Sequence, residues 1–346
     1  MKEFDLKNIK SEFIAGIPKA ELHIHLEGSI EPAMMLELAE KNKIKLKYNS
    51  IEELKKAYTF NDLRDFLYIY TQGTKVLRKA EDFYDVTLAY LEKAYSQNVL
   101  HTEIFIDFQT YEKRDIDASV IMDGTTAAIK KTSEDFGTSS YLILAFLRHL
   151  GAKSAMKTLE KALTFKHQLK AIGLASTELG YPPHLFKEVF KTAANHGFKT
   201  TAHAGEEGPA GYVRESIEVL HVDRIDHGNK AMDDPELIKL LIQKQIPLTL
   251  CPLSNLALGN VPDLSQHTLK KKLDMGMLVS VNSDDPAYFG GYVNENFFAI
   301  AKALNLDNKD IIKLAKNSFL SSFLPEEKKN YYIEKINDFV DTFDIK

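Results

Sequence analysis

The chain has 346 residues, a formal net charge of −5 and a 44% share of hydrophobic residues, so it is long enough for one large domain or two ordinary ones. Because acidic and basic residues are interspersed, neither nucleic acid nor an anionic membrane is an expected partner. No segment approaches the roughly 18 apolar residues of a membrane span, and the N-terminal M-K-E-F-D-L-K-N-I-K lacks the apolar core of a signal peptide. A single cysteine, Cys251, excludes an internal disulfide, and we expect a cytoplasmic enzyme.

Eight short apolar runs alternate with segments long enough for a helix, and no linker divides the chain. The runs expected to form strands are residues 19–25, 99–106, 140–147, 169–176, 198–203, 224–227, 246–251 and 278–284. Helical apolar spacing is clear between two pairs of them, at residues 215–220 and 235–243. Parallel strands need crossovers of this length, so we predict one domain over residues 1–346, an α/β (β/α)8 TIM barrel, with a doubly wound sheet as the alternative.

Two further segments predict helices beyond the basic barrel pattern. The first lies after strand 1, at about residues 31–98, and contains T-F-N-D-L-R-D-F-L-Y-I-Y at 59–70 with helical apolar spacing. Such a helix can pack on the barrel, and it can also act as a lid that excludes water from a site. The second segment, residues 307–343 at the C-terminus, predicts helices that pack outside the barrel.

Histidines and carboxylates stand at the C-terminal ends of several predicted strands, where barrel enzymes build their active sites. His23 and His25 share one strand, and alternate strand residues face the same side, so both imidazoles point into the barrel mouth. His203 could add a third nitrogen and Asp284 an oxygen. Each residue taken alone is well explained by hydrogen bonding or by solvent exposure. Their coincidence at the strand ends favours a zinc site with one position open for water or substrate.

Two other metal chemistries can be compared with this pattern. His101-Thr102-Glu103 matches the H-x-E of cytidine and nucleic-acid deaminases, but their downstream P-C-x-x-C needs a second cysteine. Binuclear barrel hydrolases usually bridge two metals through a modified lysine that ends the fourth strand, and this strand ends A-I-G-L-A-S. One metal is therefore expected, and Cys251 is interpreted as a small apolar filler. We assign the remaining histidines to structure or solvent, namely His101, His149, His167, His184, His196, His221 and His267.

Four motifs occur in a specific order: H-I-H-L-E-G at 23–28, H-A-G-E at 203–206, D-H-G at 226–228 and N-S-D-D-P at 282–286. With them the chain resembles the adenosine/adenine deaminase family of the metal-dependent amidohydrolase superfamily, from about residue 17 to residue 323. C-P-L-S-N at 251–255 and the longer N-S-D-D-P-A-Y-F-G-G-Y-V-N-E-N at 282–296 resemble the adenine deaminase subgroup.

The resemblance implies zinc-dependent hydrolysis of a small-molecule purine, with one Zn²⁺ per chain, converting adenine to hypoxanthine and ammonia in purine salvage. Adenosine or another 6-aminopurine is the alternative substrate. A non-deaminase metal hydrolase on the same barrel is an alternative from another class, and metal counting would reveal its second metal. A non-catalytic purine-binding relative is a further alternative, and the presence of both Glu206 and His227 argues against it.

The resemblance also implies roles for individual residues. Glu206 would donate a proton to N1 of the purine, and His227 would orient the attacking water. Asp284, besides binding zinc, would hydrogen-bond the hydroxide, and Asp285 would bind N7. Glu27 could hydrogen-bond the N9–H that only a free base offers, or fill part of the ribose volume; equally, it could hold a loop.

Three residues depart from the pattern of the adenine deaminase subgroup. Asp is more usual at the position of Ala175, Pro at Phe108 and His at Tyr111. We expect all three near the barrel mouth. They leave the reaction type unchanged and bear on which purine is the substrate.

Overall fold

Eight parallel strands form one sheet in chain order in the computed structural model, which describes residues 11–60 and 62–343. The N-terminal segment M-K-E-F-D-L-K-N-I-K, on which the expectation of no signal peptide depends, lies outside these residues. The strands are β1 (Lys19–His25), β2 (Val99–Ile106), β3 (Ser139–Leu147), β4 (Leu169–Ala175), β5 (Lys199–Ala204), β6 (Arg224–His227), β7 (Leu248–Leu250) and β8 (Val279–Val281).

The sheet closes between β1 and the segment that follows β8. The backbone N–H of His25 donates to the carbonyl of Asp284 at 2.9 Å, and the N–H of Asp284 donates to the carbonyl of His23 at 3.0 Å. Ile24 and Asp284 thereby form a parallel bridge. Together with the strand order, this closure confirms the predicted TIM barrel.

β7 and β8 are shorter than the sequence predicts. Pro247 has no N–H to give to the ladder, so β7 begins only at Leu248, and Pro252 starts a helix directly after Cys251. Beyond β8 the backbone leaves the extended conformation, since Asp284 adopts a left-handed φ of +65°. The predicted strand 278–284 therefore ends in a turn, which changes where Asp284 and Asp285 point.

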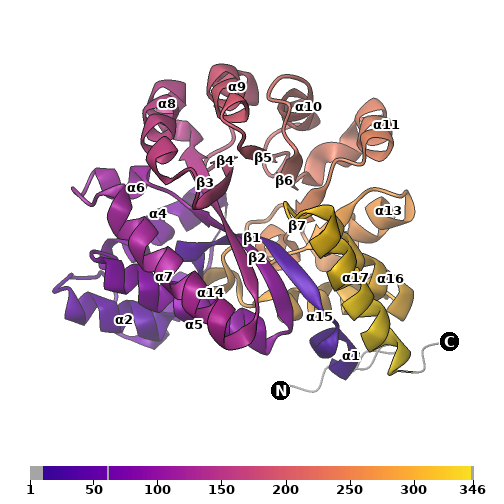
Figure 1. Ribbon diagram of the computed structural model, residues 1–346, viewed down its shortest axis with the longest axis horizontal. Coiled ribbons are helices and arrows are strands. Elements are labelled where there is room, and N and C mark those ends of the chain that lie inside the picture. Colours follow the sequence, from indigo (N-terminus) through magenta and orange to yellow (C-terminus); the bar gives the residue numbers. More distant parts are fainter. Residues whose placement is uncertain (1–10, 61, 344–346) are drawn as a thin grey trace.

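Helices cover the outside of the barrel, and Figure 1 shows α8 to α11 in a row outside β3 to β6. None of the helices described in residues 11–60 and 62–343 is long and apolar enough to cross a bilayer. The α-helices are α1 (Ser11–Gly16), α2 (Pro32–Lys41), α3 (Ile51–Ala57), α4 (Leu63–Gly73), α5 (Ala80–Ser96), α6 (Gln109–Glu112), α7 (Ala118–Phe136), α8 (Gly151–Ala162), α9 (Lys187–Asn195), α10 (Ala210–Glu218), α11 (Pro235–Lys244), α12 (Pro252–Ala257), α13 (Leu269–Asp274), α14 (Pro286–Phe289), α15 (Val293–Leu304), α16 (Asn308–Leu320) and α17 (Glu326–Asp341).

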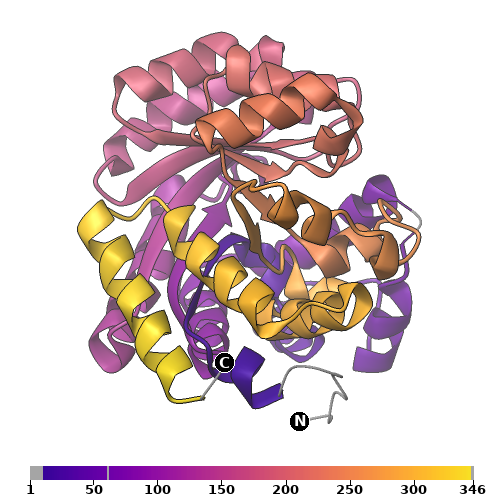
Figure 2. The same ribbon diagram turned by 90° about the vertical axis from the view of Figure 1, so that its right-hand side faces the viewer.

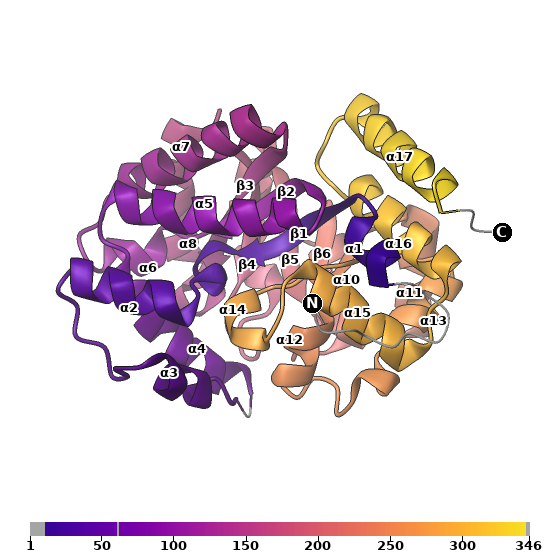
Figure 3. The same cartoon turned by 90° about the horizontal axis from the view of Figure 1, so that it is seen from below.

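The two additional helical segments lie where the sequence predicts them. Figure 2 shows α16 and α17 on the outside of the barrel, near the N-terminal α1. The ring of Phe13 in α1 packs 5.6 Å from that of Phe339 in α17. Figure 3 shows α2, α3 and α4 grouped on one side of the barrel, with α17 on the opposite side.

The predicted helix at 59–70 begins later and ends later than expected. Residue 61 lies outside the described part of the chain. α4 begins at Leu63 because the side chain of Asp62 caps it, accepting the N–H of Asp65 at 2.9 Å. Its apolar face includes Phe66 and Tyr70, which line the cavity described below. The helix therefore packs on the barrel and also covers the mouth, as a lid would.

Candidate metal centre and active site

Four side chains converge at the barrel mouth. His23 and His25 end β1, His203 lies in β5, and Asp284 follows β8. Nε2 of His203 lies 3.1 Å from Nε2 of both His23 and His25, and Oδ1 of Asp284 lies 3.4 and 3.5 Å from the same two atoms. Ligands placed 2.0–2.1 Å from a tetrahedral zinc ion stand about 3.3 Å apart, so this spacing fits one metal ion. We call these residues the four-ligand cluster.

The protonation states of the cluster also suit a cation. Burial lowers the pKa of His25 to about 3 and lowers that of His203 as well, so both imidazoles keep a free lone pair at neutral pH. Burial alone would raise the pKa of Asp284, but His23 and His227 hold it well below its usual value. Burial alone would lower the pKa of His23, but Asp284 raises it above its usual value, so a metal ion would displace a proton from this imidazole. Three nitrogens and one ionised oxygen then form a donor set that zinc accepts.

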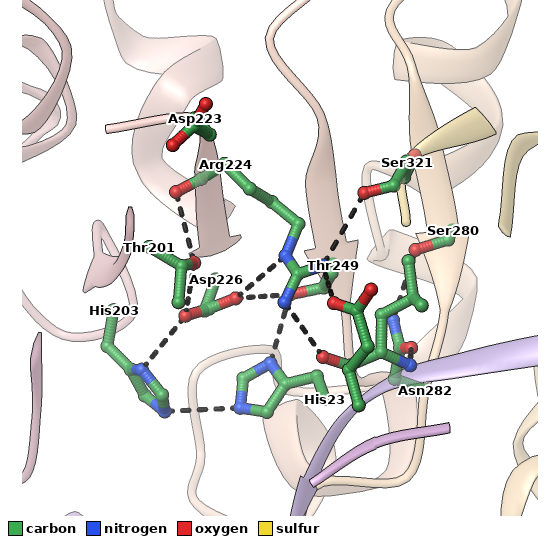
Figure 4. Close-up of polar contacts among 12 residues, drawn as sticks. His23, Thr201, His203, Asp223, Arg224, Asp226, Thr249, Ser280, Asn282 and Ser321 are labelled. Carbon is green, nitrogen blue, oxygen red and sulfur yellow. Dashed lines mark hydrogen bonds and ion pairs between the residues drawn. The ribbon is translucent and has the colours of Figure 1, made fainter. Parts of the chain in front are cut away.

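Asp226 and Thr249 orient the histidines from behind, as Figure 4 shows. Oδ2 of Asp226 lies 3.4 Å from Nδ1 of His203, and Oγ1 of Thr249 lies 3.0 Å from Nδ1 of His23. Arg224 supports Asp226 in turn, with Nε 3.6 Å from Oδ1. Partners of this kind fix the ring orientation of metal-binding histidines. Asp226 occurs in the D-H-G motif, which by itself indicates no role for it, but the residue pairs with His203 in the β5–β6 register.

Glu206 and His227 lie together beside the four-ligand cluster. Oε2 of Glu206 is 3.7 Å from Nε2 of His227, which is 3.8 Å from Oδ2 of Asp284. Burial and the charge of Asp284 raise the pKa of Glu206 well above its usual value, which favours the protonated carboxyl group. Burial lowers the pKa of His227, which is therefore neutral. The pair offers one proton donor and one proton acceptor.

Asp285 also reaches the site, because the turn at Asp284 redirects the chain. It is buried and lines the cavity, and its Oδ1 has no hydrogen-bond partner in the described residues. A Cβ on Gly28 would lie 2.0 Å from that oxygen, so only glycine leaves room for it. Burial and Asp284 raise the pKa of Asp285 well above its usual value.

Glu27 lines the cavity and is held by two tyrosines. The hydroxyl of Tyr111 donates to Oε1 at 2.8 Å, and that of Tyr70 donates to Oε2 at 3.2 Å. Burial and the nearby Asp107 raise the pKa of Glu27 to about 7. Both interpretations of Glu27 thus have a structural counterpart: it faces the ligand space, and it ties α4 and the segment after β2 to the end of β1.

The cavity between α4 and the strand ends has a volume of about 500 Å³. It is lined by Glu27, Glu206, His227, Asp284 and Asp285 and by apolar residues that include Leu63, Phe66, Ile106, Ala145, Leu147, Ala175 and Phe289. Of the three departures, Ala175 lines this cavity and Tyr111 reaches it through Glu27. Phe108 follows the end of β2, between the lining residues Asp107 and Gln109, but is itself buried and does not line the cavity; its ring lies 6.0 Å from that of Phe165.

Three of the residues assigned to structure can be compared with their surroundings. His101 hydrogen-bonds Ser139 at 2.7 Å, in agreement with a structural role. His149 is exposed and lines the same cavity, where it hydrogen-bonds Ser176 at 2.8 Å. Cys251 is buried, and its Sγ lies 3.5 Å from Nδ1 of His23, so it packs directly against the four-ligand cluster.

Several known proteins that are similar to this chain in sequence or in structure carry the name adenine deaminase. A family model described as "Adenosine deaminase" matches residues 18–339. An adenine deaminase from Crocosphaera subtropica is 53% identical over 322 residues, 93% of this chain and 99% of the relative. One from Acinetobacter baylyi is 50% identical over 328 residues, 95% and 99% of the two chains. The crystal structure of an adenine deaminase from Arthrobacter aurescens superposes with a TM-score of 0.92 at 43% identity, covering 94% of this chain and all of the other.

Proposed function

Because this chain belongs to the adenosine deaminase family, we propose that it hydrolyses adenine to hypoxanthine and ammonia with one zinc ion held by the four-ligand cluster. The family match over residues 18–339 confirms the resemblance drawn from the four motifs. The observation that carries the choice of adenine is the identity of 50% and 53% to relatives named adenine deaminase, over more than nine-tenths of the chain.

A zinc ion, when bound, would lower the pKa of water to about 7 and so supply a nucleophile at neutral pH. Side chains of the protein carry out the proton transfers of the reaction. Glu206 gives its proton to N1 of the ring, which makes C6 accept the incoming oxygen. Neutral His227 orients the attacking water and takes its proton at Nε2. The exocyclic nitrogen takes that proton from His227, and the C6–N bond breaks to release ammonia. The oxygen now on C6 gives its remaining proton to Glu206 and becomes the carbonyl of hypoxanthine. The grouping of Glu206 and His227 at 3.7 Å beside Asp284 supports this division of roles.

Asp285 and Glu27 are proposed to orient the purine. Since the pKa of Asp285 is raised, its carboxyl group can donate a hydrogen bond to N7, a ring nitrogen without a proton. Glu27 can accept the N9–H of a free base. A nucleoside has no N9–H and would lose this hydrogen bond, which contributes about 1.5–3 kcal/mol when one partner is charged.

A larger 6-aminopurine is the second candidate substrate. The cavity of about 500 Å³ is in the range of sites for drug-sized ligands, and adenine is a small one. Ala175 adds to the space on the side of β4. A small-molecule purine as ligand, a cytoplasmic location and a place in purine salvage remain predictions.

Product analysis tests the proposed reaction. Zinc-loaded protein is incubated with adenine, and the products are identified by chromatography and by ammonia release. We expect hypoxanthine and ammonia in equal amounts. Turnover of adenosine or of an N6-substituted adenine, but not of adenine, would show that the site acts on another 6-aminopurine. No ammonia from any aminopurine would overturn the deaminase assignment.

A further inference from the structure

Glu178 is a buried carboxylate outside the four-ligand cluster, in the loop that follows β4. It is 1% exposed and does not line the cavity. Its Oε1 accepts the backbone N–H of Gly205 at 2.6 Å. Its Oε2 accepts the N–H groups of Glu206, Glu207 and Gly208 at 3.0, 3.0 and 2.8 Å. An ionised carboxylate offers about four acceptor sites, so this turn uses the whole capacity of Glu178.

The turn at residues 205–208 is built around this carboxylate. Gly205 has a left-handed φ of +67°, which glycine adopts without strain. Gly208 approaches Glu178 so closely that a Cβ there would lie 2.6 Å from Oε1. The side chain of Glu206 leaves the main chain from the middle of this turn and runs to His227.

Arg148 balances the charge of Glu178 from the end of β3. Its guanidinium is fully buried, and Nη1 lies 4.0 Å from Oε1 of Glu178. None of the three guanidinium nitrogens has a hydrogen-bond partner within residues 11–60 and 62–343. A buried cation without hydrogen bonds destabilises the fold unless a nearby opposite charge compensates it. The role of Arg148 is therefore to compensate the negative charge of Glu178.

We propose that Glu178 is a positioning residue for deamination, holding the turn 205–208 so that the carboxyl group of Glu206 stands beside His227 and N1 of the purine. This inference rests on the proposed function, because it assumes that Glu206 is the proton donor. Glu178 touches neither the four-ligand cluster nor the cavity, so it acts only through the turn. A loop anchor without this role would affect folding and leave turnover intact.

The first test is Glu178→Gln in the zinc-loaded enzyme, with adenine as substrate. The glutamine side chain keeps the shape of glutamate, but its NH₂ group faces at least one backbone N–H of the turn. Because two hydrogen-bond donors repel each other, the turn moves away. A displacement of about 1 Å can cost about 10²-fold in rate, so we expect kcat to fall roughly 10- to 100-fold while KM and zinc content stay within about threefold. The matched control is Glu207→Gln, which makes the same chemical change next to Glu206 and keeps the backbone donor. A kcat equal in the two variants, with wild-type adenine turnover intact, would overturn the positioning role alone.

A second pair of variants keeps the test valid if Glu178→Gln fails to fold. Gly208→Ala places a Cβ against Glu178, whereas at Gly211 in α10 a Cβ meets nothing within 4 Å. We expect Gly208→Ala to lower kcat and Gly211→Ala to leave it unchanged; equal kcat values would contradict the proposal.

Hydrogen exchange of the amides at 205–208 gives a readout independent of activity. We expect faster exchange there in Glu178→Gln and Gly208→Ala than in their controls. If wild type does not turn over adenine, the proposed function fails. Hydrogen exchange still tests whether Glu178 holds the turn 205–208, and unchanged protection of these amides in Glu178→Gln would overturn that role.

Discussion

Replacing Glu206 by glutamine should separate proton transfer from metal binding. The carboxyl group lies 3.7 Å from His227 in a buried position, and its raised pKa favours the protonated form. Glutamine preserves the size and the buried position but carries no transferable acidic proton. General acid–base groups contribute about 10²–10⁴-fold, which corresponds to about 2.7–5.5 kcal/mol of transition-state stabilisation. We therefore expect kcat/KM for adenine to fall by two to four orders of magnitude.

The assay is steady-state deamination of adenine together with zinc analysis of the same preparation. Zinc should remain at about one per chain, since Glu206 is not in the four-ligand cluster. Glu207→Gln controls for the loss of one negative charge nearby. Activity of Glu206→Gln within about tenfold of wild type, with zinc intact, would refute the reasoning and show that another group protonates N1. Loss of zinc along with activity would instead make Glu206 part of the metal site.

Three further predictions follow from contacts described above. Purified protein should hold about one zinc per chain, and His203→Ala should lose it; a variant that retains its metal, or a wild type with two tightly bound metals, would contradict the single site. Tyr111→Phe removes the 2.8 Å hydrogen bond to Glu27, so denaturant unfolding should show a loss of about 1–3 kcal/mol, and no loss would mean that Tyr111 does not anchor Glu27. Burial lowers the pKa of Lys272 to about 7, so the unfolded chain binds more protons and the free energy of unfolding should rise from about pH 7 to pH 10. Lys272→Met should flatten that rise in thermal melts, and an unchanged slope would show that Lys272 is charged in the fold.

The barrel could be predicted because its strands are continuous apolar runs, and each is separated from the next by a stretch long enough for a helix. The convergence of the four-ligand cluster could be predicted for a similarly local reason: alternation in β1 places His23 and His25 on one face, and strand ends meet at one rim. The positions of His203 and Asp284 beside these histidines could then be predicted on the assumption that β5 and β8 end at the same level as β1.

Contacts between distant segments could not be predicted in the same way. Tyr70 and Tyr111 are 43 and 84 residues from Glu27, and nothing in the local pattern indicates that both reach the same carboxylate. Glu178 is 27 to 30 residues before the four amides that it binds. The direction of Asp285 depends on a single left-handed residue before it. Such features arise from side-chain packing between loops, which hydrophobic periodicity does not encode.

Selectivity of the site for the free base adenine can be measured as the ratio of two kcat/KM values. Zinc-loaded protein should be assayed for kcat/KM with adenine and with adenosine under identical conditions. We expect adenine to be preferred at least about tenfold, the factor that about 1.4 kcal/mol from one lost hydrogen bond to Glu27 supplies. A higher kcat/KM for adenosine would contradict the account.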